Sequence, residues 1–518
     1  MYQTDVVVIG GGATGAGVLR DAAMRGFKTL LVERNDLGTG TSGRYHGLLH
    51  SGGRYVVKDS ISARECIEEN RILRRIASAA IEDTGGLFVT TPDDDPTYAD
   101  HFAAACRDTG VTCEEIPVAE ALQREPLLNP AITRAFLVPD GSCEPWALID
   151  ANVQSARDYG GEAWPYHRVT GFECEGGRLT AVHVEDVRNG GAKTIACDFV
   201  INAAGAWAGQ VGELAGAPID MKPGKGTMVV MNHRIVNTVI NRCHLPGDGD
   251  ILVPVGSVSI IGTTSINVPD PDGYGIEPWE IDKMLSEGEK LIPGFAGTRS
   301  LRAYAGVRPL YSDQSAKSAQ GRDVTRSYSV LDHARRDGID NFISIVGGKL
   351  TTYRMMAQAG VDMLCGTLGL TRPCRTAWEP LPGSENGVYE SMAHRLAHVE
   401  EEGGNEIELV CECEFVRRTQ VEQVARSKDT HDLNDIRREL RLGMGPCQGG
   451  FCTYRAAGVL HDLRHLSPDA TNVALTRFLE ERWKGIRPVL WGDDLRQIRL
   501  DEEIYLNLLG ADRFRGAE

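Results

Sequence analysis

The chain has 518 residues, of which 42% are hydrophobic and 25% charged, and its formal net charge is −17. This composition is that of a globular protein with room for two to four domains. The excess of acid argues against binding to nucleic acid and against direct docking on anionic lipid. An anionic ligand would therefore need a local group of Arg and Lys side chains.

The N-terminal residues predict no export signal. Residues 1–5 lack the basic segment of a signal peptide, and no stretch approaches the ~20 apolar residues of a membrane span. Thirteen cysteines in such a chain are expected to be thiols or metal ligands and not disulfides. We predict a cytoplasmic protein that reaches a membrane only through a partner.

The first 33 residues predict a dinucleotide site. An apolar run ends in Gly10-x-Gly12-x-x-Gly15, a helical stretch follows over residues 16–26, and a second apolar run ends at Glu33. This is the order strand, glycine turn, helix, strand and acid. Gly12 lets the backbone approach a pyrophosphate, the helix N-terminus attracts it, and Glu33 accepts a hydrogen bond from a ribose.

The cofactor is not fixed by this unit alone. A tight turn needs glycine for steric reasons in any case, and NAD would fit the same pattern. The small, glycine- and hydroxyl-rich stretch at 40–55 favours FAD, because it suits close packing of backbone on an extended cofactor. Two later segments, 198–208 and 347–354, also end apolar runs in small residues. In these segments the backbone could again approach the cofactor closely. The alternative is that the small residues only allow tight packing at the end of a strand.

The remaining pattern predicts an α/β protein: a Rossmann-like FAD-binding domain interleaved with a mixed α+β substrate domain, over residues 1–375. A linker at 376–405, a small helical iron–sulfur domain at 406–460 and a helical C-terminal tail at 461–518 complete it. Helices are predicted at 64–82, 100–108, 118–124, 146–159, 416–427 and 433–440, and strands at 162–164, 168–174, 179–186, 193–195, 198–208, 226–232, 251–255, 257–263, 303–310, 327–331 and 341–346.

Four cysteines predict a metal site. Cys411-x-Cys413 and Cys447-x4-Cys452 are two close pairs separated by 33 residues. Four thiolates suit an iron–sulfur cluster or zinc, and zinc sites more often show Cys-x-x-Cys. The spacing, with glycines that leave backbone N–H groups for sulfur, favours a 2Fe-2S cluster over zinc or unliganded thiols. The other nine cysteines are scattered and are expected to be ordinary thiols.

Four cations stand out in the sequence. Arg54 follows Ser-Gly-Gly, Arg308 lies in G-V-R-P, Lys349 lies in G-G-K, and Arg326 is grouped with them. A cation held by a turn is placed for binding, whereas the commoner fate of an arginine is a solvated charge or an ion pair. The spacing alone does not bring the four together.

These motifs resemble the FAD-dependent glycerol-3-phosphate dehydrogenases over nearly the whole chain. The carrying segments are G-G-G-A-T-G-A-G, G-R-Y-H-G-L-L-H-S-G-G-R-Y, N-A-A-G-A-W, G-V-R-P-L and G-G-K-L-T-T-Y-R. The segments C-E-C, G-M-G-P-C-Q-G-G-F-C and R-W-K-G-I-R-P-V-L-W-G are similar to the catalytic A subunit of the anaerobic, multi-subunit enzymes. That subunit carries a bacterioferritin-associated-ferredoxin-like cluster module, which single-chain aerobic members lack.

The resemblance implies oxidation of sn-glycerol 3-phosphate to dihydroxyacetone phosphate, with FAD as hydride acceptor. Electrons would pass through the 2Fe-2S cluster to B and C subunits and then to menaquinone or ubiquinone, at the cytoplasmic membrane. By the same resemblance Arg54 binds the phosphate or its neighbouring hydroxyl, Arg308 contacts the reacting C2 oxygen, Arg326 and Lys349 complete the anion pocket, and His50 accepts the proton. A histidine titrates near neutral pH, as a general base must, although a packing role for His50 is the alternative.

The implied cofactor-binding residues share positions in the family's motifs. They are Gly10, Gly12, Ala13, Thr14, Gly15, Glu33, Arg34, Thr41, Ser42, Gly43, His46, Gly47, Leu48, Val169, Ala204, Gly205, Trp207, Gly348, Leu350 and Thr351. The chain departs from single-chain members at 226–228, where Gly-Thr-Met replaces a Gly-Ser-His segment. The rival functions are a related FAD oxidase or dehydrogenase of a 2-hydroxy acid or amine, an oxygen-using glycerol-3-phosphate oxidase, and a non-enzymatic electron carrier.

Overall fold

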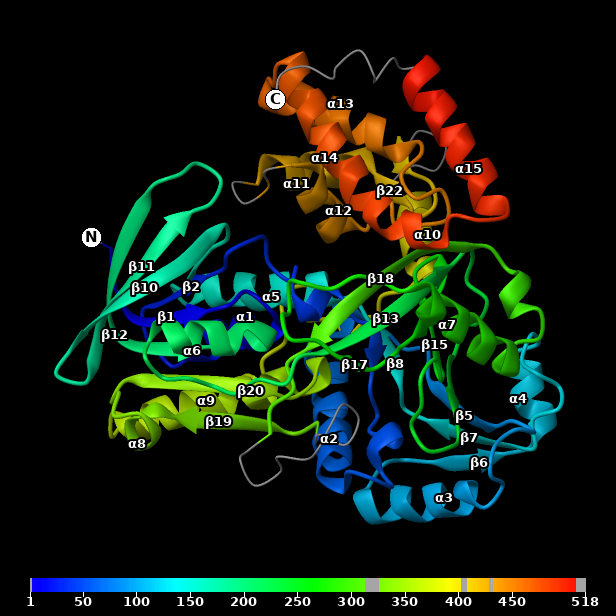
Figure 1. Cartoon of the computed structure of the whole chain (residues 1–518), viewed down its shortest axis with the longest axis horizontal. Coiled ribbons are helices and arrows are strands. Elements are labelled where there is room, and N and C mark those ends of the chain that lie inside the picture. Colours follow the sequence, from blue (N-terminus) through cyan, green and yellow to red (C-terminus); the bar gives the residue numbers. More distant parts are fainter. Residues whose placement is uncertain (1, 313–325, 402–407, 428–429, 431, 509–518) are drawn as a thin grey trace.

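The computed structural model describes residues 2–312, 326–401, 408–427, 430 and 432–508. Two large sheets lie side by side, and the C-terminal helices cover them from above (Figure 1). The described part of the chain has no helix that combines the length and the apolar character needed to cross a bilayer.

The first sheet is built on parallel strands in the order β20-β12-β1-β2-β9, and the antiparallel hairpin β10–β11 and strand β19 extend it. β1 is buried along Val6–Ile9, because a parallel strand is covered on both faces and needs apolar residues throughout. The strands are β1 (Tyr2–Ile9), β2 (Thr29–Val32), β9 (Glu162–Trp164), β10 (His167–Glu175), β11 (Arg178–Asp186), β12 (Ala192–Asn202), β19 (Tyr328–Asp332) and β20 (Phe342–Gly347).

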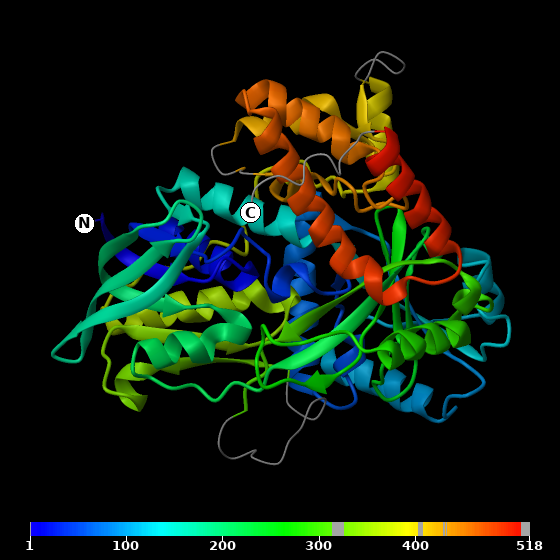
Figure 2. The same cartoon turned by 45° about the horizontal axis from the view of Figure 1, so that its top comes forward.

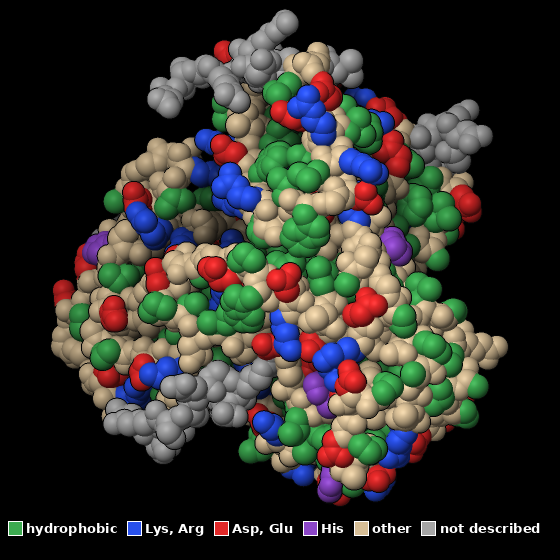
Figure 3. Space-filling view, turned by 45° about the vertical axis from the view of Figure 1, so that its right-hand side comes forward, with side chains coloured by type: hydrophobic (Ala, Val, Ile, Leu, Met, Phe, Trp, Pro, Cys, Tyr) green, Lys and Arg blue, Asp and Glu red, His purple; other side chains and the backbone are tan. Residues whose placement is uncertain are grey.

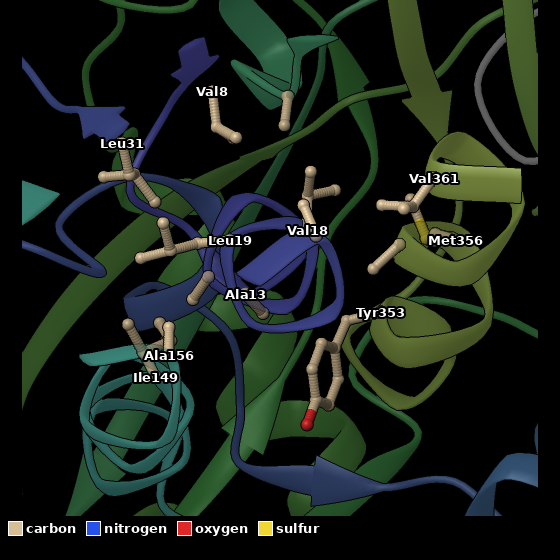
Figure 4. Packing of buried hydrophobic residues seen from close by; sticks show 14 of the residues in the cluster. Val8, Ala13, Val18, Leu19, Leu31, Ile149, Ala156, Tyr353, Met356 and Val361 are labelled. Atoms are coloured by element: carbon tan, nitrogen blue, oxygen red, sulfur yellow. The ribbon is translucent and has the colours of Figure 1, made fainter. Parts of the chain in front are cut away.

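One face of this sheet carries the largest core. Helix α1 (Ala13–Met24) lies between α5 (Pro145–Asp158) and α9 (Tyr353–Thr367), and small residues let the three helices approach closely. Figure 4 shows Leu19 of α1 directed toward α5 and Tyr353 of α9 beside α1. The Tyr353 hydroxyl accepts a hydrogen bond of 2.9 Å from Asn152 Nδ2, so this polar group in the core is satisfied.

The second sheet is mostly antiparallel, in the order β17-β13-β16-β15-β14-β5-β7-β6, with β18 on the free side of β13. Its strands are β5 (Gly86–Thr90), β6 (Glu114–Ile116), β7 (Arg134–Val138), β13 (Gly224–Met231), β14 (Val239–Arg242), β15 (Ile251–Val255), β16 (Val258–Gly262), β17 (Ile266–Asn267) and β18 (Ser300–Arg308). Helices α2 (Ser60–Ile76), α3 (Tyr98–Thr109), α4 (Val118–Arg124) and α7 (Pro278–Leu291) surround it. A small sheet of β3 (Leu48–Leu49), β4 (Ile81–Glu82) and β8 (Gly141–Cys143) joins the two large sheets.

The C-terminal module has its own apolar core, centred on Phe478 and Val421. Its elements are β21 (Leu409–Cys411), β22 (Val416–Arg417), α11 (Arg418–Arg426), α12 (Leu433–Leu440), α13 (Cys452–Arg464), α14 (Pro468–Ile486) and α15 (Asp493–Glu502), and α10 (Met392–Glu401) precedes them. A buried ion pair fixes the module on the flavoprotein part, since Arg441 Nη1 lies 2.7 Å from Glu144 Oε2. Within the module, Glu414 Oε2 lies 2.9 Å from Arg441 Nε and helps to hold that side chain in place. Figure 2 shows the module seated across both sheets.

Several predicted elements have different limits in the structure, and three of them show how. Of the strand expected at 198–208, only residues 198–202 are extended, as the end of one long strand, β12; Gly205 takes φ +57° and begins a short helical turn. The helix expected at 64–82 ends at Ile76, and residues 81–82 pair with β8 as a strand. The helix expected at 416–427 begins only at Arg418, after the short strand β22.

The first part of the predicted linker is docked on the flavoprotein domain. Leu381 is 1% exposed in the main core, and its N–H donates to Ile76 O at 2.7 Å. The Pro, Gly and acidic residues of 376–390 thus form a segment without regular secondary structure that nevertheless packs against the flavoprotein domain. The predicted limits at 405–406 and at 518 lie outside the described residues.

Candidate functional site

A cavity of about 830 Å³ runs from the glycine turn after β1 to the second sheet. Its wall is built from the carboxyl ends of β1, β2, β12 and β20, which is where open α/β sheets bind ligands. The predicted cofactor residues that line it are Gly10, Gly12, Ala13, Thr14, Glu33, Arg34, Thr41, Ser42, His46, Leu48, Val169, Ala204, Gly205, Trp207, Gly348, Leu350 and Thr351.

The glycine turn has the shape that a pyrophosphate needs. Gly10 takes φ +111°, and a Cβ there would lie 2.7 Å from Ala203 O, so only glycine fits. The Ala13 N–H at the start of α1 donates to Ser42 Oγ at 3.0 Å. The Glu33 carboxylate accepts from the Gly11 N–H at 2.7 Å, and burial raises its pKa. A carboxylate and the N–H groups of a helix N-terminus at this end fit the ribose and pyrophosphate of a dinucleotide.

Gly15, Gly43 and Gly47 lie behind the lining. A Cβ on Gly15 would lie 1.8 Å from Gly10 O, one on Gly43 would lie 2.2 Å from Gly38 O, and one on Gly47 would lie 2.8 Å from Val255 Cγ2. Because these glycines have no side chain, the backbone segments next to them can pack closely and form the wall of the cavity. Direct contact of these three with the cofactor stays a prediction.

Gly15→Ala is expected to give a protein that purifies with little FAD, because the added methyl would separate α1 from the glycine turn. The measurement is flavin absorbance per polypeptide after purification. Gly366→Ala is the matched control, since Gly366 also lies within a helix and a Cβ there meets nothing within 4 Å. Equal flavin content in the two variants would contradict the packing argument.

The predicted cations meet at the other end of the cavity. Arg54, Arg308, Arg326 and Lys349 all line it, although they come from four separate segments. Lys349 is held in place by hydrogen bonds from its Nζ to Arg326 O at 2.9 Å and to Glu65 Oε2 at 3.4 Å. A concentrated positive charge thus exists in a chain whose net charge is strongly negative.

Arg54 is half of a buried ion pair. Its Nη1 lies 2.7 Å from Asp250 Oδ1, and the Asp250 side chain is fully buried. Burial opposes the charge of the Asp250 carboxylate, but Arg54 beside it holds its pKa below the usual range. Asp250 Oδ2 also accepts from the Gly247 N–H at 2.7 Å. Asp250 therefore orients Arg54, and the sequence singled out no residue for this role.

Arg308 lies flat across the neighbouring strand. Its guanidinium donates to Lys225 O at 3.2 Å and Thr264 O at 2.9 Å, and to Thr263 Oγ1. A Cβ on Gly226 would lie 2.5 Å from Arg308 Nη2, so glycine at this position makes the room for the guanidinium. Here the Gly-Thr-Met segment, noted for its missing histidine, places Gly226 and Met228 in the lining while Thr227 is buried.

Two histidines lie among these cations. The rings of His46 and His50 are 5.9 Å apart, and the His50 ring is 5.4 Å from that of Tyr55. Burial, followed by the charges of Arg54 and Arg308, lowers the pKa of His46 to about 3. Burial lowers the pKa of His50 well below its usual value, and His46, Arg54, Lys349 and Arg326 lower it further. Both rings are therefore neutral at physiological pH.

The two histidines are held in different ways. His46 Nδ1 accepts a hydrogen bond of 3.2 Å from the Leu48 N–H, which leaves the proton of the neutral ring on Nε2. His50 is anchored through its backbone: its N–H donates to Thr351 Oγ1 at 3.2 Å, and its carbonyl accepts from Asn70 Nδ2 at 3.1 Å. His50 is thus a neutral imidazole fixed on the cavity wall.

The four predicted cluster cysteines form a ring of neighbours. Hydrogen bonds with Cys413 and Cys452 lower the pKa of Cys411 to about 3, and those with Cys413 and Cys452 lower the pKa of Cys447 to about 2. The same contacts raise the pKa of Cys413 and Cys452. Four neighbouring thiols are a ligand set that both iron–sulfur clusters and zinc use.

The sequence matches two family models. That of the FAD dependent oxidoreductases matches residues 5–354, and that of the BFD-like 2Fe-2S binding domains matches residues 409–462. The A subunit of the anaerobic glycerol-3-phosphate dehydrogenase of Escherichia coli K12 is 44% identical over 99% of this chain and 98% of its own length. The chain belongs to the FAD-dependent glycerol-3-phosphate dehydrogenase family.

Other relatives agree with this family. The A1 subunit of the anaerobic enzyme of Haloferax volcanii is 42% identical over 98% of this chain and 91% of its own length. Among solved structures, the glycerol-3-phosphate dehydrogenase of Bacillus halodurans complexed with FAD superposes with a TM-score of 0.66, at 21% identity, over 95% of this chain and 96% of its own. At that identity the structure shows the shared fold.

The matches confirm the predicted fold class and both cofactors, FAD and a 2Fe-2S cluster. The matched regions overlap the domains predicted at 1–375 and 406–460, whose boundaries stay predictions. As a family member, the chain is an FAD-dependent oxidoreductase.

Proposed function

We propose that this chain oxidises sn-glycerol 3-phosphate to dihydroxyacetone phosphate, and that Arg54, Arg308, Arg326, Lys349 and His50 act on the substrate. The observation that carries the proposal is the convergence of these four cations and one neutral histidine at one end of the flavin cavity. The names of the relatives support the substrate, since they are dehydrogenases of glycerol 3-phosphate. FAD, when bound, supplies the hydride acceptor.

Different cations would bind different parts of the substrate. Lys349 and Arg326 lie beside His50 together with Arg54, so a phosphate bound there would place the neighbouring hydroxyl near the His50 ring. Arg308 acts on His46, as Arg54 also does, and would face the C2 oxygen. Arginine provides planar, multiple donors for a phosphate or an alkoxide, whereas lysine contributes a point charge.

His50 would remove the proton of the C2 hydroxyl as the hydride leaves the same carbon. Its depressed pKa keeps it ready to accept that proton, and an anionic substrate would bring its pKa back toward neutrality. Arg308 would stabilise the charge that develops on the oxygen. This division uses one residue as base and another as the electrostatic stabiliser.

The two electrons would leave the flavin singly through the 2Fe-2S cluster to partner subunits and then to a quinone. The relatives are A subunits of a multi-subunit enzyme, which supports B and C subunits as partners and a peripheral place at the cytoplasmic membrane. The C-terminal helices expose large apolar side chains, including Trp483 (41%), Trp491 (44%) and Leu495 (52%). Figure 3 shows hydrophobic side chains gathered on this upper part of the molecule, as on a surface that a partner covers.

The rival function is an oxidase that passes electrons to oxygen. The cluster module favours the dehydrogenase, because a one-electron relay serves a protein acceptor and has no use in direct reaction with oxygen. Hydrogen peroxide formed at the rate of substrate oxidation would favour the oxidase instead.

The deciding experiment is anaerobic addition of glycerol 3-phosphate to the purified holoenzyme. We expect near-stoichiometric bleaching of the flavin band, whereas a 2-hydroxy acid leaves the spectrum unchanged. Glycerol, which lacks the phosphate, is the control for the role of the cation group. An unchanged spectrum with glycerol 3-phosphate in flavin-loaded protein would refute the proposal.

A further inference from the structure

Three arginines lie together where the flavoprotein domain meets the cluster module. Arg302 comes from β18, Arg437 from α12 and Arg482 from α14, and we call them the arginine triad. The triad is close-packed: a Cβ on Gly485 would lie 2.6 Å from Arg302 Nε, so the guanidinium rests directly on the backbone of α14. The long helix α14 lies against β18. In Figure 2 it is the orange-red helix that descends toward the sheet.

The triad carries more positive charge than its protein surroundings balance. Burial lowers the pKa of Arg302, and burial with the charge of Arg438 and Arg302 lowers that of Arg437 to about 9. Burial and then Arg302 and Arg437 lower the pKa of Arg482 well below the usual value. A guanidinium nevertheless keeps its proton in proteins, so these cations need an anion nearby.

The triad has few acidic neighbours. Glu481 raises the pKa of Arg302 and Arg437, and Asp432 raises that of Arg437, but Glu481 Oε1 is also engaged by Lys484 and Asp432 Oδ2 by Arg188. The Nε–H groups of Arg302 and Arg482 are buried and have no hydrogen-bond partner among the described residues. The acidic groups of the protein therefore do not balance the positive charge of the triad. Burying this charge costs free energy unless a further negative group is bound nearby.

Two of the cluster ligands, Cys447 and Cys452, act electrostatically on Arg482. Arg482 is 3% exposed and donates to Gln448 Oε1, in the loop between Cys447 and Cys452. Gln448 Nε2 in turn donates to Gly445 O at 2.9 Å, and a Cβ on Gly445 would lie 3.4 Å from Cys413 Sγ. Arg482 thus supports the ligand loop and places a buried positive charge beside it.

The triad also extends toward the flavin cavity. Arg44 lines that cavity and acts electrostatically on Arg302, so positive charge continues from the flavin side to the cluster ligands. Other charges at the ligands are weaker or of opposite sign. Arg455 is 43% exposed and paired with Glu412, and a Cβ on Gly450 would lie 2.9 Å from Asp501 Oδ1.

We propose that Arg482, supported by Arg302, raises the reduction potential of the 2Fe-2S cluster and so makes it a better acceptor for flavin electrons. A cluster held by four thiolates carries net negative charge, which grows when one electron is added. A nearby buried cation therefore stabilises the reduced state more than the oxidised state, and net charge and hydrogen bonds are recognised determinants of cluster potential. The proposal rests on the cluster and not on the identity of the substrate.

The test is a redox titration of the purified holoenzyme with dithionite and mediators, followed by EPR of the reduced cluster, without substrate. Arg482→Gln is expected to lower the midpoint potential by about 59 mV, which is a tenfold smaller equilibrium constant for this one-electron step. Arg482→Lys keeps the charge and is expected to keep most of the potential. Arg477→Gln, on the exposed face of the same helix, is the matched control and is expected to change nothing.

Arg482→Gln could lose its cluster, and measuring its iron content would reveal this. A second variant tests the proposal in that case. Arg302 lies on β18, outside the loop between Cys447 and Cys452. Arg302→Gln is therefore expected to lower the midpoint potential by a smaller amount and to leave the iron content unchanged. Asp501→Asn, which removes the opposite charge, is expected to shift the potential upward. Wild-type potentials in both arginine variants, or an equal fall in Arg482→Lys, would overturn the proposal. Because dithionite is the reductant, this result is independent of whether glycerol 3-phosphate bleaches the flavin.

Discussion

Arg308→Ala is expected to lower kcat for glycerol 3-phosphate oxidation by 10²–10³-fold, which corresponds to about 2.7–4 kcal/mol of transition-state stabilisation. The guanidinium is preorganised by hydrogen bonds to Lys225 O, Thr264 O and Thr263 Oγ1, so it needs no reorganisation when charge develops on the substrate oxygen. Alanine leaves those acceptors without their donor and removes the charge. Steady-state kinetics with an artificial acceptor measure the loss.

Two further variants separate the possible causes of the loss. Arg308→Lys keeps a charge but cannot reproduce the planar fork, and it is expected to recover only part of kcat. Arg335→Ala, whose side chain is 90% exposed on α8 (His333–Arg336), controls for loss of an arginine elsewhere and is expected to leave kcat unchanged. A higher KM for Arg308→Ala with kcat intact would assign Arg308 to uniform substrate binding and would contradict the role in charge stabilisation.

The sequence predicted well what depends on local chain geometry. The turn at Gly10 and Gly12 and the acid at Glu33 occupy the cavity wall where the dinucleotide pattern places them, because each follows directly from a strand end. Helices α4 and α12 and strands β9 and β15 have the predicted limits. In these segments the periodicity of apolar residues and the flanking polar residues agree with the tertiary packing.

The arrangement of the site depends on contacts between distant segments, which residue spacing does not reveal. Asp250 is one acid in a polar turn, G-D-G-D, and nothing local distinguishes it from Asp248 as the partner of Arg54. Arg302 and Arg482 are ordinary members of a strand and a helix until the two elements pack together. The docked segment around Leu381 has the composition of a loop, and composition does not report where a loop is buried.

His50→Gln is expected to lower kcat/KM by 10²–10⁴-fold, because it removes the only base that the proposal gives to the reaction. The pH profile makes the role specific. Burial and the surrounding cations hold the pKa of His50 below its usual value, so the ring loses its proton at a lower pH than a free histidine. The acid limb of kcat/KM in the wild type should therefore lie below pH ~6.5, the ordinary histidine value.

The variant should lose that acid limb, and its remaining rate should rise with pH as hydroxide replaces the missing base. His46→Gln is the comparison that distinguishes a base from a nearby ring. His46 Nδ1 already accepts from the Leu48 N–H, so this ring presents a donor and not a base to the cavity. His46→Gln is expected to change KM while the acid limb remains. An acid limb that survives in His50→Gln but disappears in His46→Gln would transfer the role of base to His46 and would show that the hydrogen bond to Leu48 breaks when substrate binds.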